Sequence, residues 1–68
     1  MEQKVLRENI QKLTVLSGEE DEELLELLLL DAEEYVLSYT NRRRLLPALE
    51  KTVRDLAVIA LNRRGTEG

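Results

Sequence analysis

Hydrophobic residues recur at intervals of three and four over three stretches of the chain, a spacing typical of amphipathic helices. These stretches predict helices over residues 3–14, 19–39 and 47–64. Turn-forming residues are scarce, with three glycines and one proline among 68 residues, so hairpins are not expected. The sequence therefore predicts an all-α fold, a small bundle of about three helices in which the middle helix is the longest.

Each predicted helix carries residues expected to face the core. The middle helix has apolar surface beyond one face, so it is either central in the fold or shared with another subunit. The additional apolar positions are Leu24, Leu27, Leu30 and Leu37. The expected inward positions are Leu6, Ile10 and Leu13, then Leu25, Leu28, Leu29, Ala32, Val36 and Tyr39, and finally Leu49, Val53, Leu56, Ala57, Ala60 and Leu61. In the third helix the residues expected to face outward are Glu50, Lys51, Arg54 and Asp55.

Polar and small residues mark the expected helix ends. Residues 15–18 are predicted to interrupt the first helix, and Ser17 with Glu20 forms a capping-box pattern at the start of the middle helix. Asn41 is expected to end the middle helix in the left-handed conformation, followed by a short connector and then Pro47 as the first residue of the third helix. Gly65 is the expected stop of that helix.

The chain is short enough that its core is marginal, and it contains no cysteine and no histidine. Disulfides and a typical zinc site are therefore excluded, so self-association or a partner protein is the expected support. No apolar run approaches eighteen residues and no signal-peptide pattern is present. We therefore expect a soluble, intracellular protein without a membrane partner.

Catalytic chemistry has little basis in this sequence. Ser17 and Ser38 have no candidate base, because histidine is absent, and no glycine-rich phosphate loop is present. Glu26, Asp31 and Glu34 are better explained as a solvated helical face than as ligands of a divalent cation. Neither an enzyme nor a cofactor is expected.

Charge is strongly segregated along the chain. Residues 1–40 contain eleven acidic and three basic residues, whereas residues 41–68 contain three acidic and seven basic ones. If the two halves also separate in space, the basic surface of one copy can dock on the acidic surface of the next. Exposed charges that contact only water, without pairing between copies, are the commoner arrangement.

Three charged groups account for most of this segregation. The acidic run comprises Glu19, Glu20, Asp21, Glu22 and Glu23, part of which is explained by the preference of a helix N-terminus for acids. The first arginine cluster comprises Arg42, Arg43 and Arg44. The second arginine cluster comprises Arg63 and Arg64, where a helix C-terminus favours cations.

Two functions are compatible with these observations. The arginine clusters and three helices also allow a small helical DNA-binding module, although the acidic net charge of −4 opposes approach to phosphates. The other alternative is a generic helical adaptor or regulator that folds on its partner.

The segment beginning at Leu24, LLELLLLDAEEYVLSYTNRRRLLPALEKTVRDLAVIALNRRGTEG, resembles the head-tail connector family of tailed bacteriophages and prophages, also called head-completion or DNA-packaging adaptor proteins. The resemblance rests on Asp31-Ala32, on Tyr39-Thr40-Asn41-Arg42, on Leu46-Pro47, and on the ending Asn62-Arg63-Arg64-Gly65. Residues 1–23 share it only weakly. Members commonly continue with a variable Ser/Gly-rich tail, whereas this sequence stops at Gly68.

The resemblance implies a single helical connector domain over residues 1–68, without that tail, acting as a structural subunit of a phage head-tail junction. Such subunits form a homo-oligomeric ring under the portal protein, extend the DNA conduit and dock the stopper or tail adaptor protein. DNA would be only transiting cargo. The expected location is the virion head-tail junction, and the bacterial host cytoplasm during assembly.

We accordingly interpret the charged groups as a candidate subunit or portal interface. Arginine pairs well with carboxylates, so the arginine clusters of one copy are expected to contact the acidic run of a neighbour. The candidate interface residues are Arg42, Arg43, Arg44, Arg63, Arg64, Glu19, Glu20, Asp21, Glu22 and Glu23.

Overall fold

The computed structural model describes the backbone of residues 1–66 and the side chains of residues 1–64. The chain forms three α-helices, α1 (Gln3–Ser17), α2 (Glu22–Thr40) and α3 (Glu50–Thr66). A 3₁₀ turn, η1 (Pro47–Leu49), leads into α3. No strand occurs among the described residues, and α2 is the longest helix. The predicted all-α bundle with a long middle helix is confirmed.

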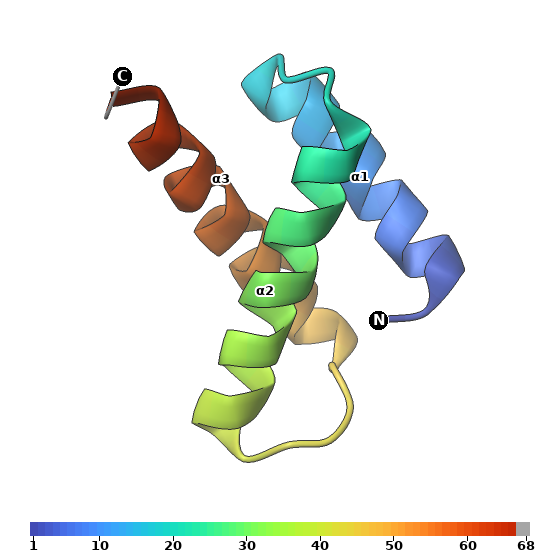
Figure 1. Ribbon diagram of the computed structural model, residues 1–68. Helices are drawn as coiled ribbons and strands as arrows, with labels where there is room; N and C mark the ends of the chain where they lie inside the picture. The colour runs from blue at the N-terminus through green and yellow to red at the C-terminus, as the bar shows by residue number, and fades with distance from the viewer. Residues whose placement is uncertain (67–68) are drawn as a thin grey trace.

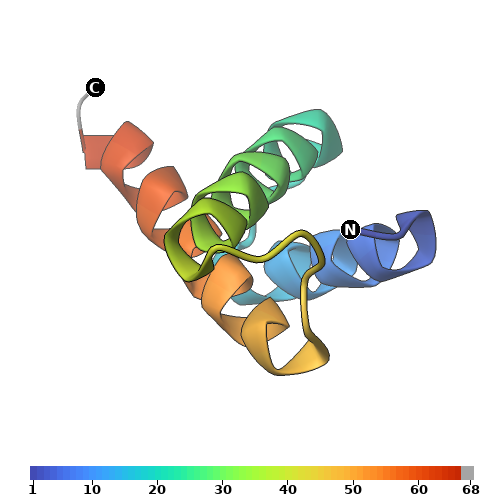
Figure 2. The same cartoon turned by 90° about the horizontal axis from the view of Figure 1, so that it is seen from below.

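The middle helix packs against both of the others. α2 lies in front of α1 and α3 in Figure 1, and the start of α1 and the end of α3 lie on opposite sides of the molecule in Figures 1 and 2. α1 and α3 contact each other less extensively than either contacts α2. The face of α2 that points away from both neighbours is therefore left on the surface.

The core consists of residues contributed by all three helices. Leu25 and Leu29 of α2 and Val53 of α3 are completely enclosed. Most of the predicted inward positions are buried or partly buried, but Tyr39 is 82% exposed because its side chain lies on the flank of α2 instead of the core face. The buried hydrophobic residues are Leu6, Leu13, Leu25, Leu29, Ala32, Val36, Val53 and Ala57.

The first helix is longer than predicted. α1 continues through Val15 and Leu16 to Ser17, so the expected interruption at these residues was wrong. The helix ends at Gly18, whose φ of 77° is the left-handed conformation that glycine adopts without steric cost. The N–H of Gly18 donates to the carbonyl oxygen of Thr14 at 2.9 Å. Val15 and Leu16 therefore project from a regular helical turn.

The start of α2 also differs from the prediction. Asp21 is the N-cap, and its carboxylate accepts a hydrogen bond from the Leu24 N–H at 3.2 Å. Ser17 instead belongs to α1, where its hydroxyl donates to the carbonyl oxygen of Leu13 at 2.6 Å. The predicted capping box of Ser17 and Glu20 was therefore wrong, because the turn at Gly18 moves the helix start by three residues.

The remaining helix ends are partly as predicted. Asn41 ends α2 with a φ of 56°, and the following N–H, that of Arg42, donates to the carbonyl oxygen of Leu37 at 3.0 Å. Pro47 occupies the first position of η1, the turn that precedes α3. α3 itself continues past Gly65 to Thr66, so Gly65 is not the stop that the sequence suggested.

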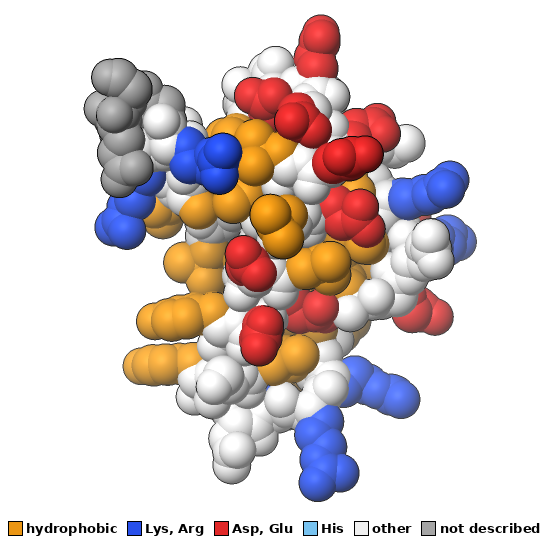
Figure 3. Space-filling view, in the orientation of Figure 1, with side chains coloured by type: hydrophobic (Ala, Val, Ile, Leu, Met, Phe, Trp, Pro, Cys, Tyr) orange, Lys and Arg blue, Asp and Glu red, His pale blue; other side chains and the backbone are white. Residues whose placement is uncertain are grey.

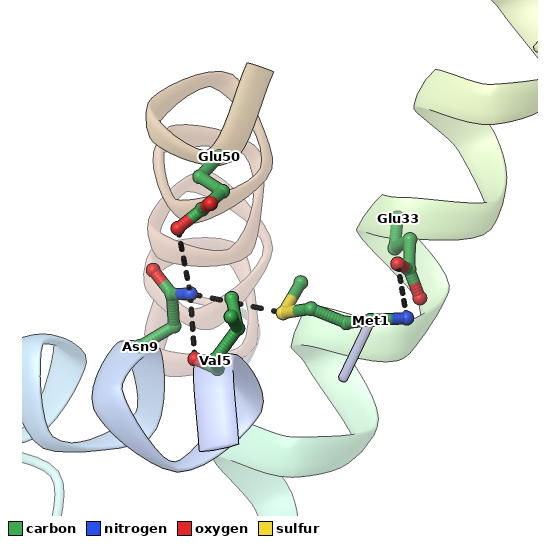
Figure 4. Close-up of polar contacts among 5 residues, drawn as sticks. All are labelled: Met1, Val5, Asn9, Glu33 and Glu50. Atoms are coloured by element: carbon green, nitrogen blue, oxygen red, sulfur yellow. Dashed lines mark hydrogen bonds and ion pairs between the residues drawn. The ribbon is translucent and has the colours of Figure 1, made fainter. Parts of the chain in front are cut away.

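A buried polar residue joins α1 to α3. Asn9 is 1% exposed, and its Oδ1 accepts a hydrogen bond from Nη1 of Arg54 at 2.6 Å. Its Nδ2 donates to the carbonyl oxygen of Val5 at 2.8 Å and, over 3.5 Å, to Oε1 of Glu50 (Figure 4). Glu50 and Arg54, both expected to face outward, thus lie partly buried at this junction.

A buried ion pair connects the N-terminal residue to α2. The α-ammonium group of Met1 lies 2.5 Å from Oε2 of Glu33, whose side chain is 10% exposed (Figure 4). The Met1 sulfur also lies 3.7 Å from Nδ2 of Asn9. The residues that precede the first turn of α1 are therefore held against the bundle.

We predict that Asn9→Ala lowers the free energy of unfolding by about 2 kcal/mol, because it leaves the guanidinium of Arg54 without its buried acceptor. Urea denaturation followed by circular dichroism measures the loss. Gln11→Ala, at an exposed position of the same helix, is the matched control and should change stability little. Equal effects of the two substitutions would show that the Asn9 junction contributes nothing specific.

We predict that Glu33→Gln destabilises the fold by about 3 kcal/mol, since it leaves the enclosed ammonium of Met1 without a counter-charge. Glu34→Gln, the same substitution at an exposed neighbouring position, should be nearly neutral. Thermal unfolding of the two variants side by side tests the ion pair. A Glu33→Gln variant as stable as the parent would contradict it.

Candidate functional site

The acidic run lies at the corner between α1 and α2. Glu20, Asp21, Glu22 and Glu23 are exposed, and Glu19 is partly buried. Within the corner the carboxylate of Glu19 accepts a hydrogen bond from the Asp21 N–H at 3.1 Å. Figure 3 shows acidic side chains gathered over this end of the molecule. The presence of an acid at Asp21 is explained by its role as the N-cap of α2. The exposed carboxylates of Glu20, Glu22 and Glu23 have no ion-pair partner among the described residues.

The first arginine cluster lies in the connector that follows α2. Its three side chains are exposed, and no ion pair within the described part of the chain involves them. Two depressions adjoin this connector. One, of about 730 Å³, is lined by Arg42 and Arg43 together with Leu30 and Leu37. The other, of about 540 Å³, is lined by Arg43 and Arg44 near Met1 and Glu33.

The second arginine cluster is far from the first. Arg63 and Arg64 are in the last turn of α3, where cations interact favourably with the helix dipole. Arg64 lines a depression together with Asp21, Glu23 and Leu24. It therefore lies beside the acidic run of its own chain, which reduces the charge that this run presents to a neighbour.

The structure separates the acidic run and the first arginine cluster by the length of α2. One precedes its first turn and the other follows its last residue, so the 19 residues of α2 place them roughly 28 Å apart along the helix axis at 1.5 Å per residue. Figure 3 shows basic side chains at the end opposite the acidic run, and others beside it. The acidic run and the first arginine cluster are thus separated in space, whereas Arg64 of the second arginine cluster lies beside the acidic run.

Several apolar side chains remain on the surface. Val15 is 84% exposed and Leu16 is 69% exposed, directly before the acidic run. Tyr35 and Tyr39 stack with ring centroids 6.3 Å apart on one flank of α2. On the flank beside the first arginine cluster, Leu30 is also partly exposed. Exposed apolar groups of this kind commonly mark protein–protein contacts.

The extra apolar surface at Leu30 was predicted from the sequence, but the exposure of Tyr39, Val15 and Leu16 was missed. The i, i+4 spacing of Tyr35 and Tyr39 indicates neighbouring rings on a helix, whereas the apolar pattern places Tyr39 in the core. Val15 and Leu16 fall in the expected helix break, although Val15 lies two positions after the buried Leu13 and therefore on the far side of a continued helix.

Acidic side chains of the described residues do not gather into a metal-binding group. The described residues contain no group of three or more His, Cys, Asp or Glu side chains able to hold a metal ion, so Glu26, Asp31 and Glu34 do not converge on one. No helix in the described part of the chain is long and apolar enough to cross a membrane. The arrangement is suited to contacts with other macromolecules.

Comparison with known protein families identifies the chain's family. A family model described as "Phage gp6-like head-tail connector protein" matches residues 6–68 and so extends over nearly the whole chain. Comparison with curated proteins and comparison with solved structures gave no match. The family match includes α1 from Leu6 onward, a part of the chain where the resemblance by motif was weak.

We predict that Asp21→Ala lowers stability by about 1 kcal/mol, because the N-cap bond to the Leu24 N–H is lost. Glu20→Ala removes a charge from the same corner without removing a cap, so it should change stability by much less. Chemical denaturation of both variants makes the comparison. Equal losses would mean that charge at the corner, and not capping, stabilises the start of α2.

Proposed function

The chain belongs to the phage gp6-like head-tail connector family, structural proteins of the phage head-tail junction, and on that premise we propose that it is a subunit of a homo-oligomeric ring. In this proposal the ring lies under the portal protein and extends the DNA conduit. Residues 1–68 act as one helical connector domain, with no catalytic role. The observation that carries the proposal is the separation of the acidic run and the first arginine cluster to opposite ends of α2.

This separation supports a head-to-tail contact between identical copies. The basic end of one copy is complementary to the acidic end of another, and such a contact uses two different surfaces of each copy. Contacts of this heterologous type close into a ring when the rotation between subunits is suitable. Complementary charges also favour the correct register over contacts between like ends.

On the basic side of the proposed interface, we assign the main role to the first arginine cluster. Its three exposed guanidinium groups can form bidentate pairs with carboxylates of a neighbour or of the portal protein. The second arginine cluster is assigned a secondary role in the same contacts, because Arg64 already lies beside Asp21 and Glu23 of its own chain.

The other proposed partners follow from a position between head and tail. The ring would meet the portal protein on one side and a stopper or tail adaptor protein on the other. DNA would pass as cargo, and a channel wall with few phosphate contacts would favour its transit. The protein would be present in the bacterial host cytoplasm during assembly and at the head-tail junction in the virion.

The proposed interface is tested by reversing the charge of the first arginine cluster with the triple variant Arg42→Glu, Arg43→Glu, Arg44→Glu. We expect native mass spectrometry of the parent across a protein and salt series to show oligomers that weaken at high salt. The triple variant should assemble at least tenfold more weakly, because each pair of opposite charges becomes a pair of like charges.

The matched control is Lys4→Glu, Lys12→Glu, Lys51→Glu, which makes the same change in net charge at exposed positions of α1 and α3. It should assemble much like the parent. Equal assembly of parent and arginine variant would remove the first arginine cluster from the interface. A parent that stays monomeric but binds a short DNA duplex with a steep salt dependence would favour the DNA-binding alternative instead.

A further inference from the structure

Resting on the ring-subunit function proposed above, we propose that the α1–α2 corner of one copy seats in a groove beside the end of α2 in a second copy. The inserted element is the projecting pair Val15 and Leu16, followed by the acidic run. The receiving groove is the 730 Å³ depression whose lining includes Leu30, Leu37, Ser38, Arg42 and Arg43. The contact is therefore apolar at its centre and ionic at its edge.

Two properties of the α1–α2 corner favour contact with a partner. Val15 and Leu16 expose most of their side-chain surface, although nothing in the regular helix at those positions requires an apolar residue. The acidic run begins three residues after Leu16, and no basic residue occurs in the sequence between Lys12 and Arg42. The corner thus presents apolar and negatively charged surface side by side.

The receiving groove has the complementary composition. Leu30 and Leu37 lie on one flank of α2, seven residues and about two turns apart, and both line the groove. Arg42 and Arg43 enter it from the connector beyond Asn41. Glu34 also lines the groove, but two arginines outnumber it, and Glu33 is already paired with the ammonium of Met1.

A second copy of the chain is the occupant of the groove that both composition and charge favour. The apolar pair at the corner is suited to the leucines of the groove, and the acidic run is suited to its arginines. Every copy carries one such corner and one such groove. They cannot meet within one chain, because Ser38 lies roughly 24 Å along α2 from the start of that helix. The contact must therefore run from one copy to the next, as a head-to-tail assembly requires.

Cysteine cross-linking tests this contact directly, because the chain contains no cysteine of its own. The test variant carries Leu16→Cys and Ser38→Cys, two exposed positions that lie too far apart for a bond within one chain. Under mild oxidation we expect a ladder of covalent multimers on a denaturing gel, ending in a closed species. The control pairs Leu16→Cys with Tyr35→Cys, an exposed position that lines a different depression, and it should form no such ladder.

The outcomes separate this contact from the ring function itself. A ladder specific to the variant with Leu16→Cys and Ser38→Cys supports the contact. Oligomers in native mass spectrometry without that ladder would overturn the contact but leave the ring function standing, as would occupation of the groove by a different protein. A parent that stays monomeric and a test variant that gives no ladder would overturn both.

A second variant tests the apolar centre without relying on oxidation. Val15→Ser with Leu16→Ser should weaken assembly at least tenfold and leave the unfolding temperature almost unchanged, because both side chains are mostly exposed in the single chain. Ile59→Ser, at an exposed apolar position of α3, is the control and should assemble like the parent. Unchanged assembly of the double serine variant would overturn the apolar part of the contact.

Discussion

Burial of one face of α2 against both α1 and α3 is the interaction on which the rest of the structure depends. The enclosed side chains of Leu25 and Leu29 belong to this face, and Val53 of α3 is enclosed with them. Among the described residues, no further element is available to cover α2 from the other side. The fold therefore leaves the outer face and both ends of its central helix on the surface, and those are the places where its apolar and charged groups are concentrated.

The contact between α1 and α3 includes a buried polar junction. Asn9 is enclosed, and it bonds simultaneously to its own helix at Val5 and to Arg54 of α3. A buried amide whose partners are fixed by geometry favours one alignment of two helices over sliding alternatives. The ion pair of Met1 and Glu33 acts in the same way between the start of the chain and α2. Together they set the positions of α1 and α3 relative to α2, and hence the relative position of the acidic run and the first arginine cluster.

Apolar periodicity was sufficient to predict three helices and most of the core, because residues such as Leu29 recur with the helical period whatever their neighbours are. Helix ends were harder to predict, since the left-handed turn at Gly18 competed with a capping-box pattern and moved the cap of α2 to Asp21. Polar junctions were harder still, because only the approach of Asn9 from another helix draws the charged Arg54 inward. The candidate interface was predictable at the level of charge, since its acidic run and first arginine cluster are contiguous in sequence. Its apolar component was not, because the exposure of the apolar pair before the acidic run depends on where α1 ends.

That dependence connects the fold to the assembly contact that we propose. Gly18 allows α1 to continue for three residues beyond the predicted end, and those residues project Val15 and Leu16 next to carboxylates that cap and begin α2. At the other end, the left-handed Asn41 turns the chain so that two arginines of the first cluster line the same groove as two leucines of α2. Two local backbone turns, one at each end of α2, thus place an apolar and acidic surface at one end of this helix and an apolar and basic surface at the other. The two surfaces differ in charge and are complementary. Because the unlike ends lie too far apart to meet within one copy, any contact between them joins one copy to the next head to tail, and such contacts close into a ring when the rotation between copies is suitable.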